Sequence, residues 1–136
     1  MFGNSLRQRS ETILLVEHEQ SVLNTILHML EPEGYCVLQS QSPRAALQIG
    51  SRHDYDIDLL LTDVILPGLY GWELAELMKL DYPQLRVLYI AGWREDDIQE
   101  LGDASDLILR KPFRSNELVR AVRNALAEHL VKKGLW

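Results

Sequence analysis

The stretch Leu59–Gly68, LLLTDVILPG, joins an apolar run to an acidic residue and a tight turn. The run leads directly into Asp63, and Pro67-Gly68 then favours a reversal of the chain. A continuous apolar run of this length is typical of a central parallel strand that is covered on both faces. Functional groups of open α/β sheets follow the carboxyl ends of their strands, so Asp63 is a candidate functional residue.

Strand and helix patterns alternate five times along the chain. The other apolar runs predict strands over Thr12–Val16, Tyr35–Ser40, Leu85–Gly92 and residues 106–113, and helical spacing follows over residues 19–35, 42–53, 71–83, 94–102 and 115–133. This alternation predicts an α/β fold, a doubly wound five-stranded parallel sheet of order 2-1-3-4-5 in a flavodoxin-like (βα)5 arrangement.

Local signals predict where several helices begin and end. Ser42 and Pro43 suit the cap and first position of the second helix, Gly34 suits the stop of the first, and Ser115 or Asn116 suits the cap of the last. The third helix is expected to turn Leu74, Leu77 and Met78 inward. We expect a disordered lead-in or linker over residues 1–10, one domain over 11–131 and a frayed tail over 132–136.

Composition excludes several classes of function. The chain has 136 residues and a net charge of −6, which argues against direct binding of nucleic acid or of an anionic membrane. No apolar run is long enough to span a bilayer. The single cysteine, Cys36, has no partner for an internal disulfide, and we expect a small buried thiol in a cytoplasmic protein.

The predicted topology brings charged residues from three strand ends to one crevice. Glu17, His18 and Glu19 follow the first strand, beside Asp63, and Lys111 follows the fifth. Clustered carboxylates are costly unless they share positive charge, which a divalent cation and a lysine would supply. Mg²⁺ takes oxygen ligands of this kind, and such a site suits phosphoryl transfer to Asp63.

The chain resembles the receiver domains of bacterial two-component response regulators, from about Thr12 to about His129. The resemblance rests on ILLVEHE, LLLTDVILPGLYGWELA, VLYIAGW and LRKPF, in that order and at those spacings. In style the chain is most similar to the receivers at the C-termini of hybrid sensor kinases.

This resemblance implies a function and a set of site residues. Asp63 would be the phosphoacceptor, assisted by Lys111, and Glu17, Asp63 and the backbone carbonyl of Ile65 would hold Mg²⁺. Lys111 precedes a proline, and the family motif implies a cis bond there. The donor would be a histidine kinase or phosphotransfer protein. The chain would not be an enzyme beyond slow autodephosphorylation, and it could form a homodimer through its fourth helix, fifth strand and fifth helix.

Three positions depart from the family pattern. His18 stands where a second carboxylate is expected, and imidazole is a poor Mg²⁺ ligand that suits Zn²⁺, Cu²⁺ or Ni²⁺ better, so we expect weak Mg²⁺ binding. At the two switch positions, Ala91 lacks the usual hydroxyl and Ile108 replaces an aromatic residue. The loss of a hydrogen bond to a charged group, about 1.5–3 kcal/mol, predicts a weakened signalling shift.

Other interpretations remain open at this point. The chain could be a non-phosphorylated pseudo-receiver that acts only through protein contacts. Asp63 could be a loop or capping residue, Lys111 a surface lysine, and His18 a tolerated substitution rather than a metal ligand. A flavodoxin-type nucleotide or flavin binder is disfavoured, because the loop EHEQS after the first strand is acidic and would repel phosphate.

Overall fold

The computed structural model describes residues 10–92 and 107–132, with only the backbone described over residues 128–132. The helix predicted over 94–102 therefore lies outside the described residues, as do nearly all of the predicted lead-in and most of the predicted tail.

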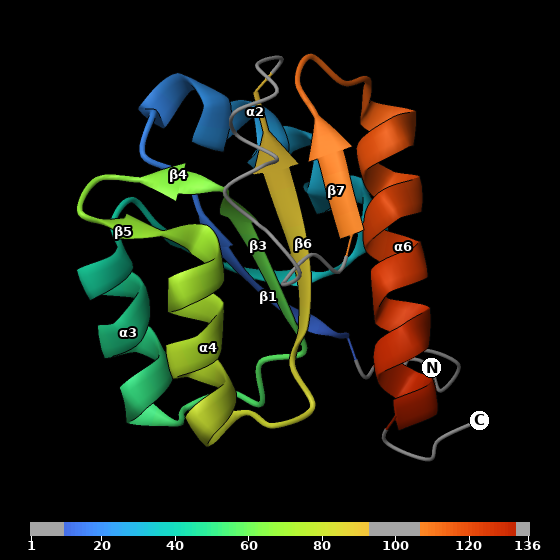
Figure 1. Ribbon diagram of the computed structural model, residues 1–136. Coiled ribbons are helices and arrows are strands. Elements are labelled where there is room, and N and C mark those ends of the chain that lie inside the picture. Colours follow the sequence, from blue (N-terminus) through green and yellow to red (C-terminus); the bar gives the residue numbers. More distant parts are fainter. Residues whose placement is uncertain (1–9, 93–106, 133–136) are drawn as a thin grey trace.

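Five parallel strands form the central sheet (Figure 1). Their order is β2 (Cys36–Ser40), β1 (Thr12–Val16), β3 (Leu59–Asp63), β6 (Arg86–Ala91) and β7 (Leu107–Arg110). Numbered among themselves these strands run 2-1-3-4-5, so the predicted order is confirmed. The winding direction reverses between β1 and β3, where Leu14 lies opposite Leu60.

Helices cover both faces of this sheet. α2 (Gln20–Leu30) and α6 (Ser115–Lys132) pack on one face, while α3 (Pro43–Arg52) and α4 (Gly71–Asp81) pack on the other (Figure 1). Every residue of β3 is buried, and its side chains alternate between two cores. Leu60 belongs to the core under α3 and α4, whereas Leu59 and Leu61 belong to the core under α2 and α6. Burial on both faces explains why this strand reads as a continuous apolar run.

Two of the three predicted helix ends are confirmed by the structure, and one is wrong. Ser42 Oγ accepts a hydrogen bond from the Ala45 amide at 3.1 Å, so the predicted cap is confirmed. Gly34, at φ 82°, ends the short 3₁₀ helix η1 (Glu31–Glu33) that continues α2, as predicted. The cap predicted for α6 is wrong, because Ser115 is already the first helical residue. Glu117 instead accepts a hydrogen bond from the Arg114 amide at 2.7 Å.

Two further predictions about burial need correction. Leu77 is 45% exposed, because the buried face of α4 follows the spacing of Gly71, Leu74, Ala75 and Met78 and leaves Leu77 at its side. Cys36 is half-buried rather than buried, since β2 is an edge strand of the sheet. None of the helices in the described part of the chain has the length and apolar content that a membrane span requires.

Candidate functional site

Three strand ends meet at the carboxyl edge of the sheet, and backbone hydrogen bonds fix each of them. The Glu17 amide, directly after β1, donates to the Ser40 carbonyl at 3.1 Å, and the Lys111 amide, directly after β7, donates to the Ala91 carbonyl at 2.8 Å. Asp63 is the last residue of β3, and the next amide, that of Val64, donates to the Ile90 carbonyl at 3.0 Å. The functional side chains therefore stand on a rigid sheet edge rather than on free loops.

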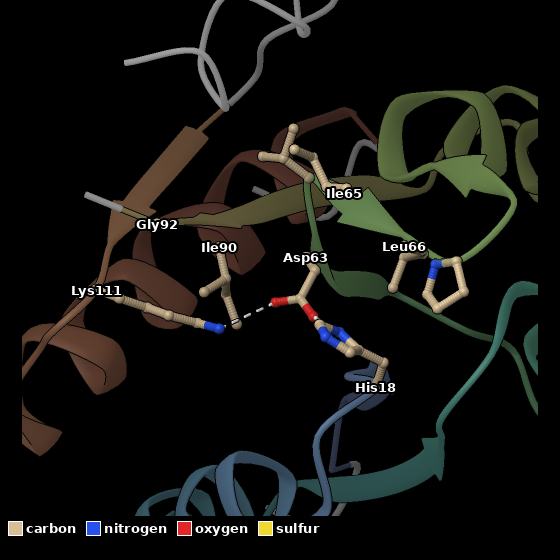
Figure 2. Close-up of a pocket in the computed structure, with 9 residues that line it drawn as sticks. His18, Asp63, Ile65, Leu66, Ile90, Gly92 and Lys111 are labelled. Carbon is tan, nitrogen blue, oxygen red and sulfur yellow. Dashed lines mark hydrogen bonds and ion pairs between the residues drawn. The ribbon is translucent and has the colours of Figure 1, made fainter. Parts of the chain in front are cut away.

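The carboxylates of Glu17 and Asp63 lie between the ammonium group of Lys111 and the imidazole of His18. Lys111 Nζ lies 3.5 Å from Glu17 Oε1 and 3.6 Å from Asp63 Oδ1. On the other side of Asp63, His18 Nδ1 lies 3.1 Å from Asp63 Oδ2 (Figure 2). The same nitrogen lies 3.5 Å from Glu17 Oε2. The structure thus brings together Glu17, Asp63 and Lys111, which the sequence placed at three strand ends, and closes the arrangement with His18.

Burial makes the two carboxylates unusual. Glu17 is fully buried and Asp63 is 4% exposed. Burial, together with the neighbouring Glu17 carboxyl group, raises the pKa of Asp63 from 3.8 to about 7, while Lys111 and His18 act in the opposite direction. A carboxyl group with such a pKa, facing a cavity, is a candidate for chemistry rather than for structural pairing.

One oxygen atom of each buried carboxylate lacks a hydrogen-bond partner among the described residues. Glu17 Oε1 and Asp63 Oδ1 are buried and have no hydrogen-bond partner among the described residues, and their only cation, Lys111 Nζ, lies beyond ordinary hydrogen-bond length. A cavity of about 370 Å³ adjoins Asp63, and its lining also includes His18, Ile65, Gly92 and Lys111 (Figure 2). The site therefore has both room and unmet bonding capacity for a small charged ligand.

A tight hairpin and a glycine hold the backbone of Asp63 in place. β4 (Ile65–Leu66) and β5 (Leu69–Tyr70) pair antiparallel through a turn in which Gly68 has φ 84°, a conformation that favours glycine. Gly71 then donates its amide to the Val64 carbonyl at 2.6 Å. A Cβ atom on Gly71 would collide with the Asp63 carbonyl oxygen. Sequence reasoning missed this residue, whose only signal was a glycine at the start of a helix, close after Asp63.

The candidate metal ligands fit a hard cation only in part. Glu17, His18 and Asp63 each offer one donor atom, and these atoms lie within 4.8 Å of one another. The two carboxylates suit Mg²⁺, but the imidazole does not. Glu19 does not replace it, because its side chain points to solvent and its amide donates to Glu17 Oε2 at 3.0 Å. Ile65 lines the cavity, and its carbonyl as a ligand stays a prediction.

The two predicted switch positions lie on the strands where the sequence pattern placed them. Ala91 is buried at the end of β6, and Ile108, half-buried on β7, packs against the core under α3 and α4. Neither side chain carries a hydroxyl group. The Lys111–Pro112 peptide bond is cis, as predicted.

The order of the strands defines a flavodoxin-like α/β domain. A charged crevice lies at the edge of its sheet, where Lys111 faces the carboxylate that ends the central strand. The family model described as response regulator receiver domain matches residues 13–123. The chain therefore belongs to the response regulator receiver family.

Relatives from several bacteria are similar to this chain. The cell cycle response regulator CtrA of Brucella ovis is 30% identical over 112 residues, which cover 81% of this chain and 47% of that protein. The chain thus spans about half the length of the curated relatives it matches.

Solved receiver structures share the fold. The response regulator receiver domain protein from Clostridium thermocellum has a TM-score of 0.77 at 29% identity, covering 93% of this chain and 99% of that one. The receiver protein from Sinorhizobium medicae has a TM-score of 0.78 at 27% identity, covering 89% and 98% respectively.

Proposed function

We propose that Asp63 accepts a phosphoryl group from the phosphohistidine of a histidine kinase or phosphotransfer protein. The observation that carries this proposal is the buried pair of carboxylates bridged by the Lys111 ammonium beside an open cavity. Nucleophile and charge neutraliser converge there from different strands, as phosphoryl transfer requires.

The proposed step is an in-line displacement at phosphorus. One carboxylate oxygen of Asp63 forms the new O–P bond while the N–P bond of the donor histidine breaks, and the leaving imidazole takes up a proton. Lys111 lies beside Asp63 Oδ1, from which its charge can neutralise a phosphoryl oxygen. Since only ionised Asp63 is nucleophilic, its pKa of about 7 favours transfer at neutral pH and above.

A divalent cation would add further neutralisation of the phosphoryl oxygens. Receiver domains hold Mg²⁺ in this acidic pocket, and here Glu17, Asp63 and the Ile65 carbonyl would be its ligands. The imidazole of His18 in the remaining place leads us to propose weak Mg²⁺ affinity.

The read-out of phosphorylation is proposed to be unusual. Ala91 offers no hydroxyl donor to a phosphoryl oxygen, and Ile108 offers no aromatic ring that could move with it. We therefore infer a small conformational shift over β7 and α6. Contact with a partner or with a second copy is proposed for this same region.

We propose that this domain is cytoplasmic, because its proposed phosphoryl donor is. Histidine kinases present their phosphohistidine in the cytoplasm, and a half-buried free thiol, Cys36, fits that reducing compartment. We place the receiver domain over residues 11–131, without direct contact to nucleic acid or membrane.

A pseudo-receiver is the second candidate. His18, Ala91 and Ile108 favour it, because each departs from a residue that phosphoryl signalling uses. In that case Asp63→Asn would leave partner binding unchanged, whereas substitutions on the exposed faces of β7 and α6 would abolish it.

Phosphorylation of the purified chain tests the proposal. Incubation with a small-molecule phosphodonor, without metal and across Mg²⁺ and Mn²⁺ concentrations, should add the mass of one phosphoryl group to wild type and none to Asp63→Asn. The exposed Asp81→Asn is the matched control and should be phosphorylated like wild type. No mass gain in wild type under any of these conditions would refute the proposed function.

A further inference from the structure

We propose that Glu17, His18 and Asp63 form a three-ligand site for Zn²⁺, which this chain binds in preference to Mg²⁺. The inference deepens the proposed function, and rests on it, in that it names the cation of the same site. Zinc binding itself needs no phosphoryl group, so the two proposals can be tested apart.

The spacing of the donor atoms suits a small cation. His18 Nδ1 lies 3.1 Å from Asp63 Oδ2 and 3.5 Å from Glu17 Oε2. Zinc bonds of about 2.0–2.2 Å at tetrahedral angles place neighbouring donors about 3.4 Å apart. A cation entering between these atoms would replace the hydrogen bond between His18 and Asp63, and the donor atoms, which lie within 4.8 Å of one another, would contract around it.

Lys111 contacts one oxygen of each carboxylate and leaves the other oxygen free to bind a metal beside His18. Lys111 Nζ contacts Glu17 Oε1 and Asp63 Oδ1, whereas His18 faces the other oxygen of each carboxylate, Oε2 and Oδ2. A cation beside His18 and the ammonium group of Lys111 would thus lie on opposite sides of the pair. Two carboxylates against a dication and an ammonium leave a positive charge that attracts an anionic fourth ligand.

On the Lys111 side of the pair, one oxygen of each carboxylate has unmet bonding capacity. Glu17 is fully buried and Asp63 is 4% exposed, yet Glu17 Oε1 and Asp63 Oδ1 have no hydrogen-bond partner among the described residues. Buried carboxylates normally satisfy their lone pairs. The independent sign of a ligand beside His18 is the cavity of about 370 Å³, which His18, Asp63 and Lys111 help to line. It provides the open fourth position that a zinc site with three protein ligands keeps for water or a substrate oxygen.

Donor chemistry separates zinc from magnesium. Mg²⁺ requires oxygen ligands near octahedral positions, and His18 removes one of them. Imidazole suits Zn²⁺, and among the described residues no other His, Cys, Asp or Glu joins the cluster to restore an all-oxygen set. The selectivity of the site therefore depends on residue 18.

A metal competition experiment on His18→Asp tests this inference. Tag-free, chelator-treated full chain is titrated with Zn²⁺ against a chromophoric chelator, with and without excess Mg²⁺. We expect wild type to bind one Zn²⁺ that Mg²⁺ does not displace. His18→Asp should bind Zn²⁺ at least about tenfold more weakly, because it exchanges the imidazole that suits Zn²⁺ for a third carboxylate that suits Mg²⁺. The same variant should bind Mg²⁺ more tightly than wild type.

The matched control is His28→Asp, which makes the same replacement at an exposed histidine beside Glu31. Its Zn²⁺ affinity should equal that of wild type. Because the His18 side chain is 42% exposed, both variants should fold, which circular dichroism checks, and His18→Asn provides a second, uncharged variant with the same expected loss. Co²⁺ should give a visible d–d band in wild type that His18→Asn lacks.

Equal Zn²⁺ affinity in wild type and both His18 variants would overturn the inference, as would displacement of Zn²⁺ by Mg²⁺. Phosphorylation is measured separately and without zinc. Zinc binding through His18 in a chain that is never phosphorylated would refute only the proposed function. Phosphorylation of a chain whose zinc affinity does not depend on His18 would refute only this inference.

Discussion

Asp63 carries the largest electrostatic cost among the described residues of this domain. Its carboxyl group is buried beside a second buried carboxyl group, and its pKa rises from 3.8 to about 7 in consequence. Lys111 and His18 offset only part of this cost. An incoming cation would therefore favour the ionised form of this carboxyl group.

This raised pKa predicts a pH-dependent gain in stability for Asp63→Asn. Between the unfolded and folded pKa values the folded wild type holds a proton that the unfolded chain has lost, so its free energy of unfolding falls as pH rises from about 4 to about 7. The asparagine variant lacks this dependence, so it should exceed wild type by more at about pH 8 than at about pH 4.5 in urea unfolding.

The control for this prediction is the exposed Glu76→Gln on α4, whose effect on stability should be small and similar at both pH values. A stability difference between Asp63→Asn and wild type that stays constant, or shrinks, as pH rises would contradict the electrostatic account.

At the scale of elements, the segment from β3 through the β4–β5 hairpin to α4 forms one positioning unit. Asp63 ends the strand, the hairpin turns the chain, and Gly71 brings the start of α4 back against the Asp63 carbonyl. Glu73 holds this junction, since its Oε1 accepts a hydrogen bond from the Tyr70 amide at 3.0 Å. Close packing of the helix start on the strand end fixes the acid that the site uses.

Gly71→Ala should therefore destabilise the domain. The added Cβ collides with backbone rather than with a movable side chain, so the helix start or the strand end must shift. Overpacking of this kind costs about 1–3 kcal/mol, which urea unfolding would measure.

Gly50→Ala on α3 is the matched substitution. Its Cβ would lie 3.1 Å from Met78 Cε, the flexible end of a side chain that can move aside. Alanine also favours the helix by about 1 kcal/mol, so we expect little loss or a gain. Equal destabilisation by both alanines would show that backbone contact at Gly71 is not decisive.

At the scale of the whole molecule, the sheet separates two cores that share no side chain among the residues described by the structure. Ile57 lies in the core under α3 and α4, and Ile26 lies in the core under α2 and α6. Each core packs against its own face of the sheet. Their contributions to stability should therefore be nearly independent.

Ile57→Val and Ile26→Val test this independence. Each should lower the free energy of unfolding by about 0.5–1.5 kcal/mol, and the double variant should match the sum within about 0.5 kcal/mol. Ile13→Val combined with Ile26→Val, two residues of one core, is the comparison in which a larger deviation from the sum is expected. Strong non-additivity across the sheet would contradict the picture of two cores.

Most of the fold was predictable because its signals are local or follow from general rules of connection. The apolar run into Asp63, the cap at Ser42 and the stop at Gly34 each depend on neighbouring residues. Strand order followed from alternation and from right-handed crossovers. Predictions failed at Leu77 and Ser115, where the packing direction of α4 and the side chain of Glu117 decided between locally equivalent choices.

The sequence by itself determined the sheet, its order and which strand ends carry acids and a lysine. The reason is that the spacing of apolar residues along the chain indicates each strand and helix. Only the tertiary structure decided that Lys111 and His18 contact opposite oxygens of the Glu17–Asp63 pair, that burial raises the pKa of Asp63, and that Gly71 supports it. The reason is physical: His18, Asp63 and Lys111 are far apart in sequence. Their separations of a few ångströms therefore depend on how the whole sheet and its helices pack, which no local pattern encodes.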